Sequence, residues 1–224
     1  MSHFESWTDL LKPEFYINLG GLWLILFIIF AETGLFIGFF LPGDSLLFIS
    51  GIYSNDIITL SLGDFDSEFL HCTILSLLVS IAAILGNFVG YWFGYKSGPM
   101  LYEKEDTFWF KKKYIIKAKD FFEEHGVVAV IFARFLPIVR TFAPIIAGVV
   151  KMSKPKFTLY NIIGAVAWSF SMIFAGHYLQ KLFENQFGID LKEHLEKIVI
   201  FLVVITTLPV LLKLLKKSPS EKSA

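Results

Sequence analysis

Apolar residues gather in six long stretches of the chain, at residues 17–33, 34–53, 69–95, 126–150, 157–180 and 197–215. Four of them predict spanning helices. Residues 69–95 and 157–180 can cross a hydrocarbon core of about 30 Å with tilt, and 197–215 is just long enough. The stretch 17–33 is short, and we expect its helix to continue for one turn into the next stretch. The pattern predicts an integral membrane protein.

Proline interrupts the other two stretches, 34–53 and 126–150. Proline removes a backbone donor and glycine permits a sharp turn, so a helix is expected to stop at these positions. Broken backbone at membrane depth is tolerated only inside protein or beside a water-filled cavity. We therefore interpret both stretches as re-entrant helical hairpins, with turn residues Pro42, Gly43, Pro137 and Pro144.

Charged residues between the stretches predict the orientation. Residues 54–68 hold acids and no lysine or arginine, whereas 96–125 and 151–156 are rich in lysine. Basic loops remain in the cytoplasm. This rule places both termini in the cytoplasm and makes the two hairpins enter the membrane from opposite faces.

Matched broken segments of opposite orientation are typical of inverted-repeat transporters whose site lies at the midplane. We predict an all-α integral membrane fold with about four transmembrane helices, two oppositely oriented re-entrant hairpins forming an inverted repeat, and amphipathic interfacial helices. The predicted parts are an interfacial segment at 1–16, one membrane domain at 17–215 with a cytoplasmic amphipathic segment near 99–125, and a basic tail at 216–224.

Composition agrees with the bilayer as the solvent. The chain of 224 residues is 55% hydrophobic, with a mean hydropathy of +0.62, whereas a soluble domain is about 45–50% apolar. The formal net charge is zero, so bulk charge gives no indication of nucleic-acid binding. The single cysteine, Cys72, is expected to pack in its apolar run. No nucleophile elbow, phosphate loop or zinc spacing is present, so we expect no enzyme, no cofactor and no metal.

Four ionisable residues lie within the apolar stretches: Glu32, Asp44, Arg134 and Arg140. Each such charge near a helix centre costs about 2.5–3.5 kcal/mol for insertion. A charge is retained at such a position when it pairs with another charge, faces water or binds a charged ligand. Because the two arginines flank Pro137, a break there lets both guanidiniums converge. We interpret them as a binding pair for a phosphate, whose oxygens match the guanidinium fork.

The two acids bracket the first hairpin. Burial favours a neutral carboxyl group and a neighbouring arginine favours the ionised form, so such a group can exchange a proton near physiological pH. We predict that Glu32 and Asp44 couple transport to protons. The alternative is that they only neutralise the arginines and brace the hairpins, although a buried charge cluster stabilises poorly compared with apolar packing.

Weaker candidates lie on the two long predicted helices: Asn87, Tyr91, Asn161 and Trp168. Packing between helices is the alternative role for them. A stripe of small residues at a spacing of four, typical of close helix contacts, surrounds the first two: Gly86, Gly90 and Gly94.

The segment 132–148, FARFLPIVRTFAPIIAG, resembles the signature of the DedA family, also called the SNARE-associated or VTT-domain family. The acids near Pro42-Gly43, the GNFVGYW run and the later Asn161 and Trp168 follow that family's order, and the resemblance covers roughly residues 20–180. It implies an inner-membrane protein with two re-entrant hairpins that transports lipid with the proton motive force, notably undecaprenyl phosphate. Ile138 and Asn87 depart from the glycine and aspartate that the family often has there.

We therefore expect a proton-coupled transporter of a lipid phosphate in the bacterial cytoplasmic membrane, with undecaprenyl phosphate or a phospholipid and protons as partners. A cation/proton antiporter or small-anion carrier is one alternative, and a membrane scaffold without transport is another. The sequence leaves open the lipid, the direction of transport, flippase against scramblase action, and whether the chain forms a homo-oligomer.

Overall fold

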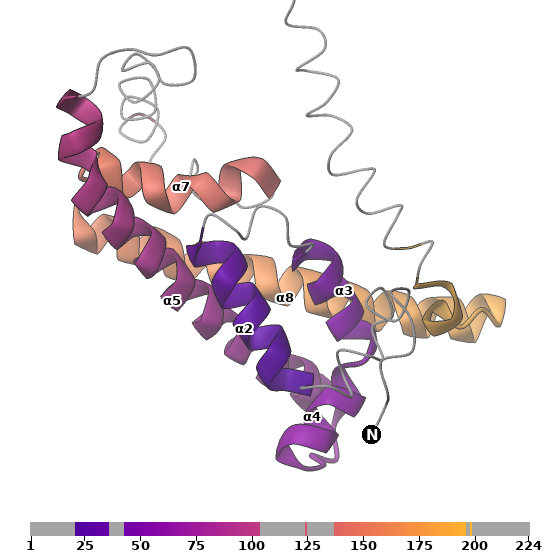
Figure 1. Cartoon of the computed structure of the whole chain (residues 1–224). Helices are drawn as coiled ribbons and strands as arrows, with labels where there is room; N and C mark the ends of the chain where they lie inside the picture. Colours follow the sequence, from indigo (N-terminus) through magenta and orange to yellow (C-terminus); the bar gives the residue numbers. More distant parts are fainter. Residues whose placement is uncertain (1–20, 36–42, 104–123, 125–136, 196–197, 199–224) are drawn as a thin grey trace, which may run out of the picture.

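The computed structural model describes residues 21–35, 43–103, 124, 137–195 and 198 (Figure 1). Every regular element within these residues is a helix. The predicted segments at 1–16 and 216–224 lie outside the described residues, as do nearly all of 197–215 and most of the segment near 99–125.

Two long helices form the frame of the molecule. Helix α5, Glu68–Glu103, has 36 residues and helix α8, Lys154–Phe187, has 34. At 1.5 Å per residue they are about 54 and 51 Å long, so both exceed the stretches predicted at 69–95 and 157–180. In the part of the chain that the structure describes, these two helices are long and apolar enough to span a membrane. The span within α5 is Glu68–Gly98.

Local sequence explains the bounds of α8. Pro155 occupies its first turn, where a missing amide donor does no harm. The helix ends at Gly188, whose φ of 62° lies in the left-handed region and whose amide donates to the carbonyls of Glu184 and Phe183. The hydrophobic run stops earlier than the helix because backbone hydrogen bonding continues into the polar ends.

Shorter helices accompany the frame: α2 (Gly21–Gly34), α3 (Gly43–Ile52), α4 (Ser54–Leu62), α7 (Pro137–Val149) and the 3-10 helix η3 (Leu191–His194). Helix α2, with 14 residues, is about 21 Å long and shorter than the hydrocarbon core. Helix α3 begins at the predicted turn residue Gly43. Helices α3 and α4 bend by 80° at their junction, as a broken span or a re-entrant loop would.

One predicted turn residue does not break its helix. Pro137 is the first described residue of α7, so the break predicted there stays a prediction, but Pro144 lies inside α7, which continues to Val149. The prediction that Pro144 stops the helix is therefore wrong. A proline at this position removes the donor that would serve the carbonyl of Arg140, four residues earlier. The helix continues because its packing against α5 outweighs one lost hydrogen bond.

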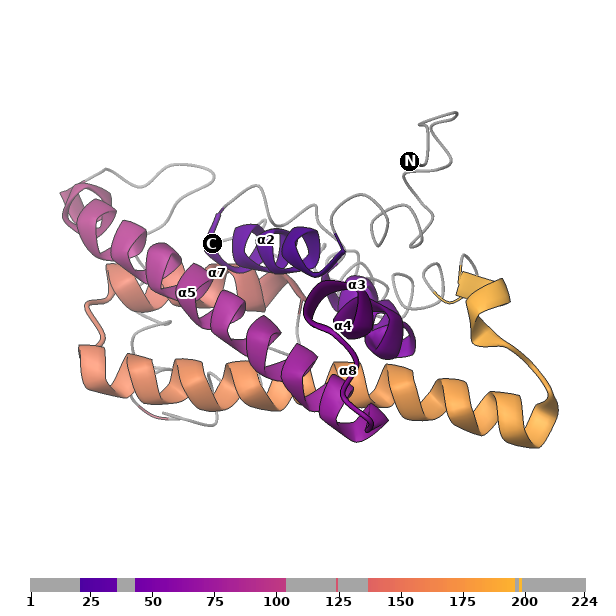
Figure 2. The same cartoon turned by 90° about the horizontal axis from the view of Figure 1, so that it is seen from below.

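Helices α2 and α7 pack on α5, α3 packs on α8, and α5 packs on α8. Figures 1 and 2 show the two long helices crossing each other at an angle. Large apolar side chains on the outer faces are exposed, which a soluble monomer avoids and a lipid-facing surface requires. They include Trp23, Phe27, Phe69, Leu77, Ile81, Leu85, Trp92, Leu159, Ile162 and Tyr178.

Backbones approach closely where α3 crosses α8. A Cβ atom added to Gly51 would overlap the carbonyl oxygen of Ile173, and one added to Gly176 would overlap the carbonyl oxygen of Phe48. Each glycine thus faces the carbonyl three residues before the other.

The crossing of α7 and α5 repeats this arrangement. A Cβ atom on Gly148 would overlap the carbonyl oxygen of Tyr91, and one on Gly94 that of Ile145. The helix that follows each predicted turn therefore packs on the long helix of the other half, which is what an inverted repeat predicts. The predicted packing role of the glycine stripe is also confirmed at Gly86, where a Cβ atom would overlap Thr33.

Replacing Gly94 by alanine is expected to destabilise the fold by about 1–3 kcal/mol, because the new methyl group would force α5 and α7 apart. Gly90→Ala is the matched control one turn earlier, since its nearest atoms would lie at 3.5 Å, an ordinary contact. Thermal unfolding in detergent compares the two variants. Equal loss in both would contradict the close crossing at Gly94.

Candidate functional site

Three helix ends meet in the interior of the protein. Glu32 lies in the last turn of α2, Asp44 in the first turn of α3 and Arg140 in the first turn of α7. These residues are far apart in the sequence and adjacent to the breaks that interrupt their segments. The breaks let side chains from three helices point at one another.

Arg140 is shared between the two acids. Its Nη1 donates to Asp44 Oδ1 and its Nη2 donates to Glu32 Oε1. The side chains of Arg140 and Glu32 are 3% and 2% exposed, and that of Asp44 is 19% exposed. Removing Arg140 would take from two buried acids the guanidinium that they share, whereas removing one acid leaves Arg140 paired with the other.

Trp168 of α8 completes the cluster. Its indole Nε1 donates to Asp44 Oδ1 at 2.8 Å, and its ring lies 4.6 Å from the guanidinium carbon of Arg140. The ring face attracts the cation while the ring N–H holds the carboxylate. Trp168 therefore orients both members of the Arg140–Asp44 pair.

Helix dipoles distinguish the two acids. Asp44 is favoured by the N-terminal end of its own helix, whereas Glu32 sits at the disfavoured C-terminal end of α2. Tertiary structure compensates Glu32 by placing its carboxylate against Gly43 at the start of α3. A Cβ atom on Gly43 would overlap that carboxylate, so glycine is required there by the close approach.

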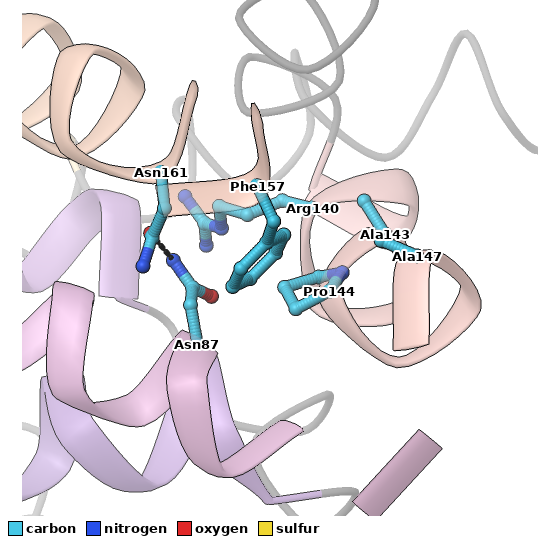
Figure 3. Close-up of a pocket in the computed structure, with 7 residues that line it drawn as sticks. All are labelled: Asn87, Arg140, Ala143, Pro144, Ala147, Phe157 and Asn161. Carbon is cyan, nitrogen blue, oxygen red and sulfur yellow. Dashed lines mark hydrogen bonds between the residues drawn. The ribbon is translucent and has the colours of Figure 1, made fainter. Parts of the chain in front are cut away.

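A small cavity lies on the other side of Arg140, between α5, α7 and α8. Asn87 Nδ2 donates to Asn161 Oδ1 at 2.8 Å along one wall, and Asn161 Nδ2 donates to the carbonyl of Ile84 at 3.1 Å. Apolar side chains form the remaining walls (Figure 3). The lining residues are Asn87, Arg140, Ala143, Pro144, Ala147, Phe157 and Asn161.

The structure brings most of the predicted site residues together. Glu32, Asp44, Arg140 and Trp168 form one cluster, and Asn87 and Asn161 pair beside it. Tyr91 lies apart from the ion pairs. Its hydroxyl donates to the carbonyl of Met152 at 2.6 Å and its ring stacks on Phe157. Arg134 and Pro42 are outside the described residues, so the convergence of two arginines stays a prediction.

A second polar network, which the sequence reasoning missed, lies where α4, α5 and α8 meet. Glu68 pairs with Lys181 and lies 3.5 Å from His177 Nε2. Ser54 Oγ lies 3.3 Å from both His177 Nδ1 and the Sγ atom of Cys72. The signal was a polar stripe on α5 at helical spacing: Glu68, Cys72, Ser76, Ser80 and Asn87.

The same stripe continues between the two networks. Ser80 Oγ lies 2.6 Å from Ser169 Oγ, and Ser169 also donates to the carbonyl of Ser76 at 3.1 Å. Polar pairs thus recur along the α5–α8 interface. Over the ranges that the structure covers, no group of three or more His, Cys, Asp or Glu side chains could hold a metal ion.

These features define an all-helical membrane protein with a buried, shared ion pair where broken helices meet. Residues 20–178 match the family model described as VTT domain. The chain is 36% identical over 199 residues to Protein DedA of Escherichia coli strain K12, covering 88% of this chain and 84% of that protein. The chain belongs to the DedA family of VTT-domain membrane proteins.

Two further relatives are also membrane proteins. An uncharacterized membrane protein of Mycobacterium tuberculosis strain H37Rv is 38% identical over 177 residues, covering 76% of this chain and 74% of that protein. The inner membrane protein YqjA of Escherichia coli K12 is 30% identical over 164 residues, covering 73% and 70%. No solved structure matches this chain.

Proposed function

We propose that this protein moves a lipid phosphate, undecaprenyl phosphate or a phospholipid, across the bacterial cytoplasmic membrane with the proton motive force. The observation that carries the proposal is the buried Arg140 shared between Glu32 and Asp44. A guanidinium held in this way is a phosphate site whose ligands are, at rest, the protein's own carboxylates.

Exchange of ligands couples the phosphate to the proton. While both carboxylates are ionised, the two terminal nitrogens of Arg140 are occupied. Protonation of one acid releases one edge of the guanidinium, which a phosphate oxygen then takes. By linkage, a bound phosphate favours the protonated acid by the same free energy. Loss of the proton on the other side of the membrane restores the ion pair and expels the phosphate.

Glu32 is the proposed coupling group. Among the described residues its carboxylate has one side-chain donor, Arg140, whereas Asp44 has both Arg140 and the indole of Trp168. Glu32 Oε2 is buried and has no partner. Neutralising Glu32 therefore weakens fewer side-chain hydrogen bonds than neutralising Asp44. Asp44 keeps its hydrogen bonds to Arg140 and Trp168 and holds Arg140 in place.

The lipid tail needs no cavity of its own in this scheme. The outer faces of α5 and α8 expose apolar side chains such as Leu77, Ile81 and Leu85 of α5, and the tail stays in the bilayer beside them. The reaction is transport without a catalytic step. We place both termini in the cytoplasm, as the lysine distribution predicts.

Reconstituted vesicles test the proposal. Vesicles containing the protein and a fluorescent lipid phosphate are treated with an impermeant quencher, and the rate at which protected lipid becomes accessible is measured with and without a pH gradient. We expect the protein to accelerate this exchange for the lipid phosphate and not for a neutral lipid, with a further increase in the gradient.

The alternatives give other results in the same vesicles. Movement of inorganic phosphate or of a cation without movement of lipid would identify a small-ion carrier. No flux of either kind, from a protein that is folded and correctly inserted, would favour a scaffold.

A further inference from the structure

Two buried polar atoms face the small cavity without a partner. Arg140 Nε and Asn87 Oδ1 have no hydrogen-bond partner, and both residues line the cavity (Figure 3). Arg140 is 3% exposed and Asn87 is 2% exposed. Buried polar groups are nearly always satisfied by protein or by ordered water, so these two atoms indicate an occupant.

The amide orientation of Asn87 is fixed by its neighbours. The carbonyl of Ile84 accepts from Asn161 Nδ2, which turns Asn161 Oδ1 toward Asn87. That oxygen accepts from Asn87 Nδ2. Turning the Asn87 amide over would place two oxygens against each other and two donors on the cavity side. The acceptor Oδ1 therefore faces the cavity opposite the donor Nε–H of Arg140.

These two atoms select the chemistry of the occupant. Arg140 Nε can only donate a hydrogen bond, and Asn87 Oδ1 can only accept one. The occupant must accept from the first and donate to the second. A metal cation is opposed by the guanidinium, and a fully ionised anion has no proton to give. A neutral hydroxyl group or a water molecule satisfies both atoms.

The size of the cavity limits the occupant to a single water molecule. About 20 Å³ is open to the centre of a water molecule, and a single water needs about 10–15 Å³ of such space. A phosphate or sugar is too large. The remaining walls, Ala143, Pro144, Ala147 and Phe157, offer no side-chain hydrogen bond.

We propose that one structural water is bound between Arg140 Nε and Asn87 Oδ1 and joins the ion-pair cluster to the Asn87–Asn161 pair. This site is independent of the proposed transport activity. It lies on the edge of the guanidinium that the two carboxylates leave unoccupied. The water therefore holds Arg140 from the α5 side while Glu32 and Asp44 hold it from the helix ends.

A structure at a resolution that shows ordered water tests this proposal directly. We expect density at hydrogen-bonding distance, about 2.7–3.2 Å, from both atoms. In Asn87→Leu the acceptor is lost to a side chain of similar volume, and the density should disappear. An empty cavity in the wild-type protein would overturn the proposal.

Radiolytic hydroxyl labelling provides a second readout. Phe157 borders the cavity and is 2% exposed, whereas Phe48 lies in the apolar core and is 9% exposed. A bound water should make Phe157 react faster than Phe48 despite its lower exposure. The excess should vanish in Asn87→Leu. Labelling of Phe157 at or below the rate of Phe48 in the wild-type protein would contradict the bound water.

Discussion

Arg140→Gln is expected to destabilise the protein by about 3–5 kcal/mol, because it removes the guanidinium that two neighbouring buried acids share. Glu32 is 2% exposed and Asp44 19% exposed, so water compensates little of the loss. Thermal and chemical unfolding of the purified protein in detergent measure the effect. A variant as stable as the wild type would mean that Arg140 does not neutralise these acids.

A triple variant separates folding from function. Glu32→Gln, Asp44→Asn and Arg140→Gln together replace the three charged side chains of the cluster by neutral amides. The triple variant no longer has the uncompensated buried charges that destabilise Arg140→Gln, so most of the lost stability should return. Transport of the lipid phosphate should not return, since the phosphate has lost its guanidinium. A triple variant that transports normally would favour a purely structural role for the cluster.

Glu32→Gln is expected to remove the pH dependence of phosphate binding. In the wild-type protein, binding that takes up one proton tightens by up to about tenfold for each unit by which the pH falls. Glutamine cannot compete for Arg140 as a carboxylate does. The variant should therefore bind as tightly at high pH as the wild type does at lower pH, with a flat profile.

Binding of a lipid phosphate to the protein in nanodiscs, measured between about pH 7.5 and 9, tests this expectation. That range avoids the second ionisation of a phosphate monoester, whose pKa is about 6. Asp44→Asn is the matched control, because it neutralises the other partner of Arg140 and should leave a pH-dependent profile. A flat profile in Asp44→Asn and a sloping one in Glu32→Gln would assign the coupling to Asp44 instead.

The order of elements was accessible from the sequence because each signal is local. Long apolar runs predict α5 and α8, and Pro-Gly predicts the start of α3. Helix bounds were less predictable, since hydrogen bonding carries both long helices past the apolar runs. The prediction for Pro144 was wrong for a related reason. A proline by itself favours a helix end, but the packing of α7 on α5 keeps the helix continuous through this residue.

The choice of Glu32, Asp44 and Arg140 as site residues came from the sequence, because a charge inside an apolar run is expensive wherever it lies. The sequence did not reveal which groups these three residues contact. That one guanidinium serves both acids, that Trp168 holds Asp44, and that Gly43 makes room for Glu32 depend on where three helix ends meet.

By itself, the sequence determined the class of the protein and the residues that must be paired. Composition and the spacing of prolines and charges act along the chain and need no knowledge of distant neighbours. Only the tertiary structure decided which groups pair, which polar atoms of Arg140 and Asn87 face a cavity, and how α5 and α8 align their polar stripes. Those features arise between helices that are distant in sequence, where packing and not local preference selects the contacts.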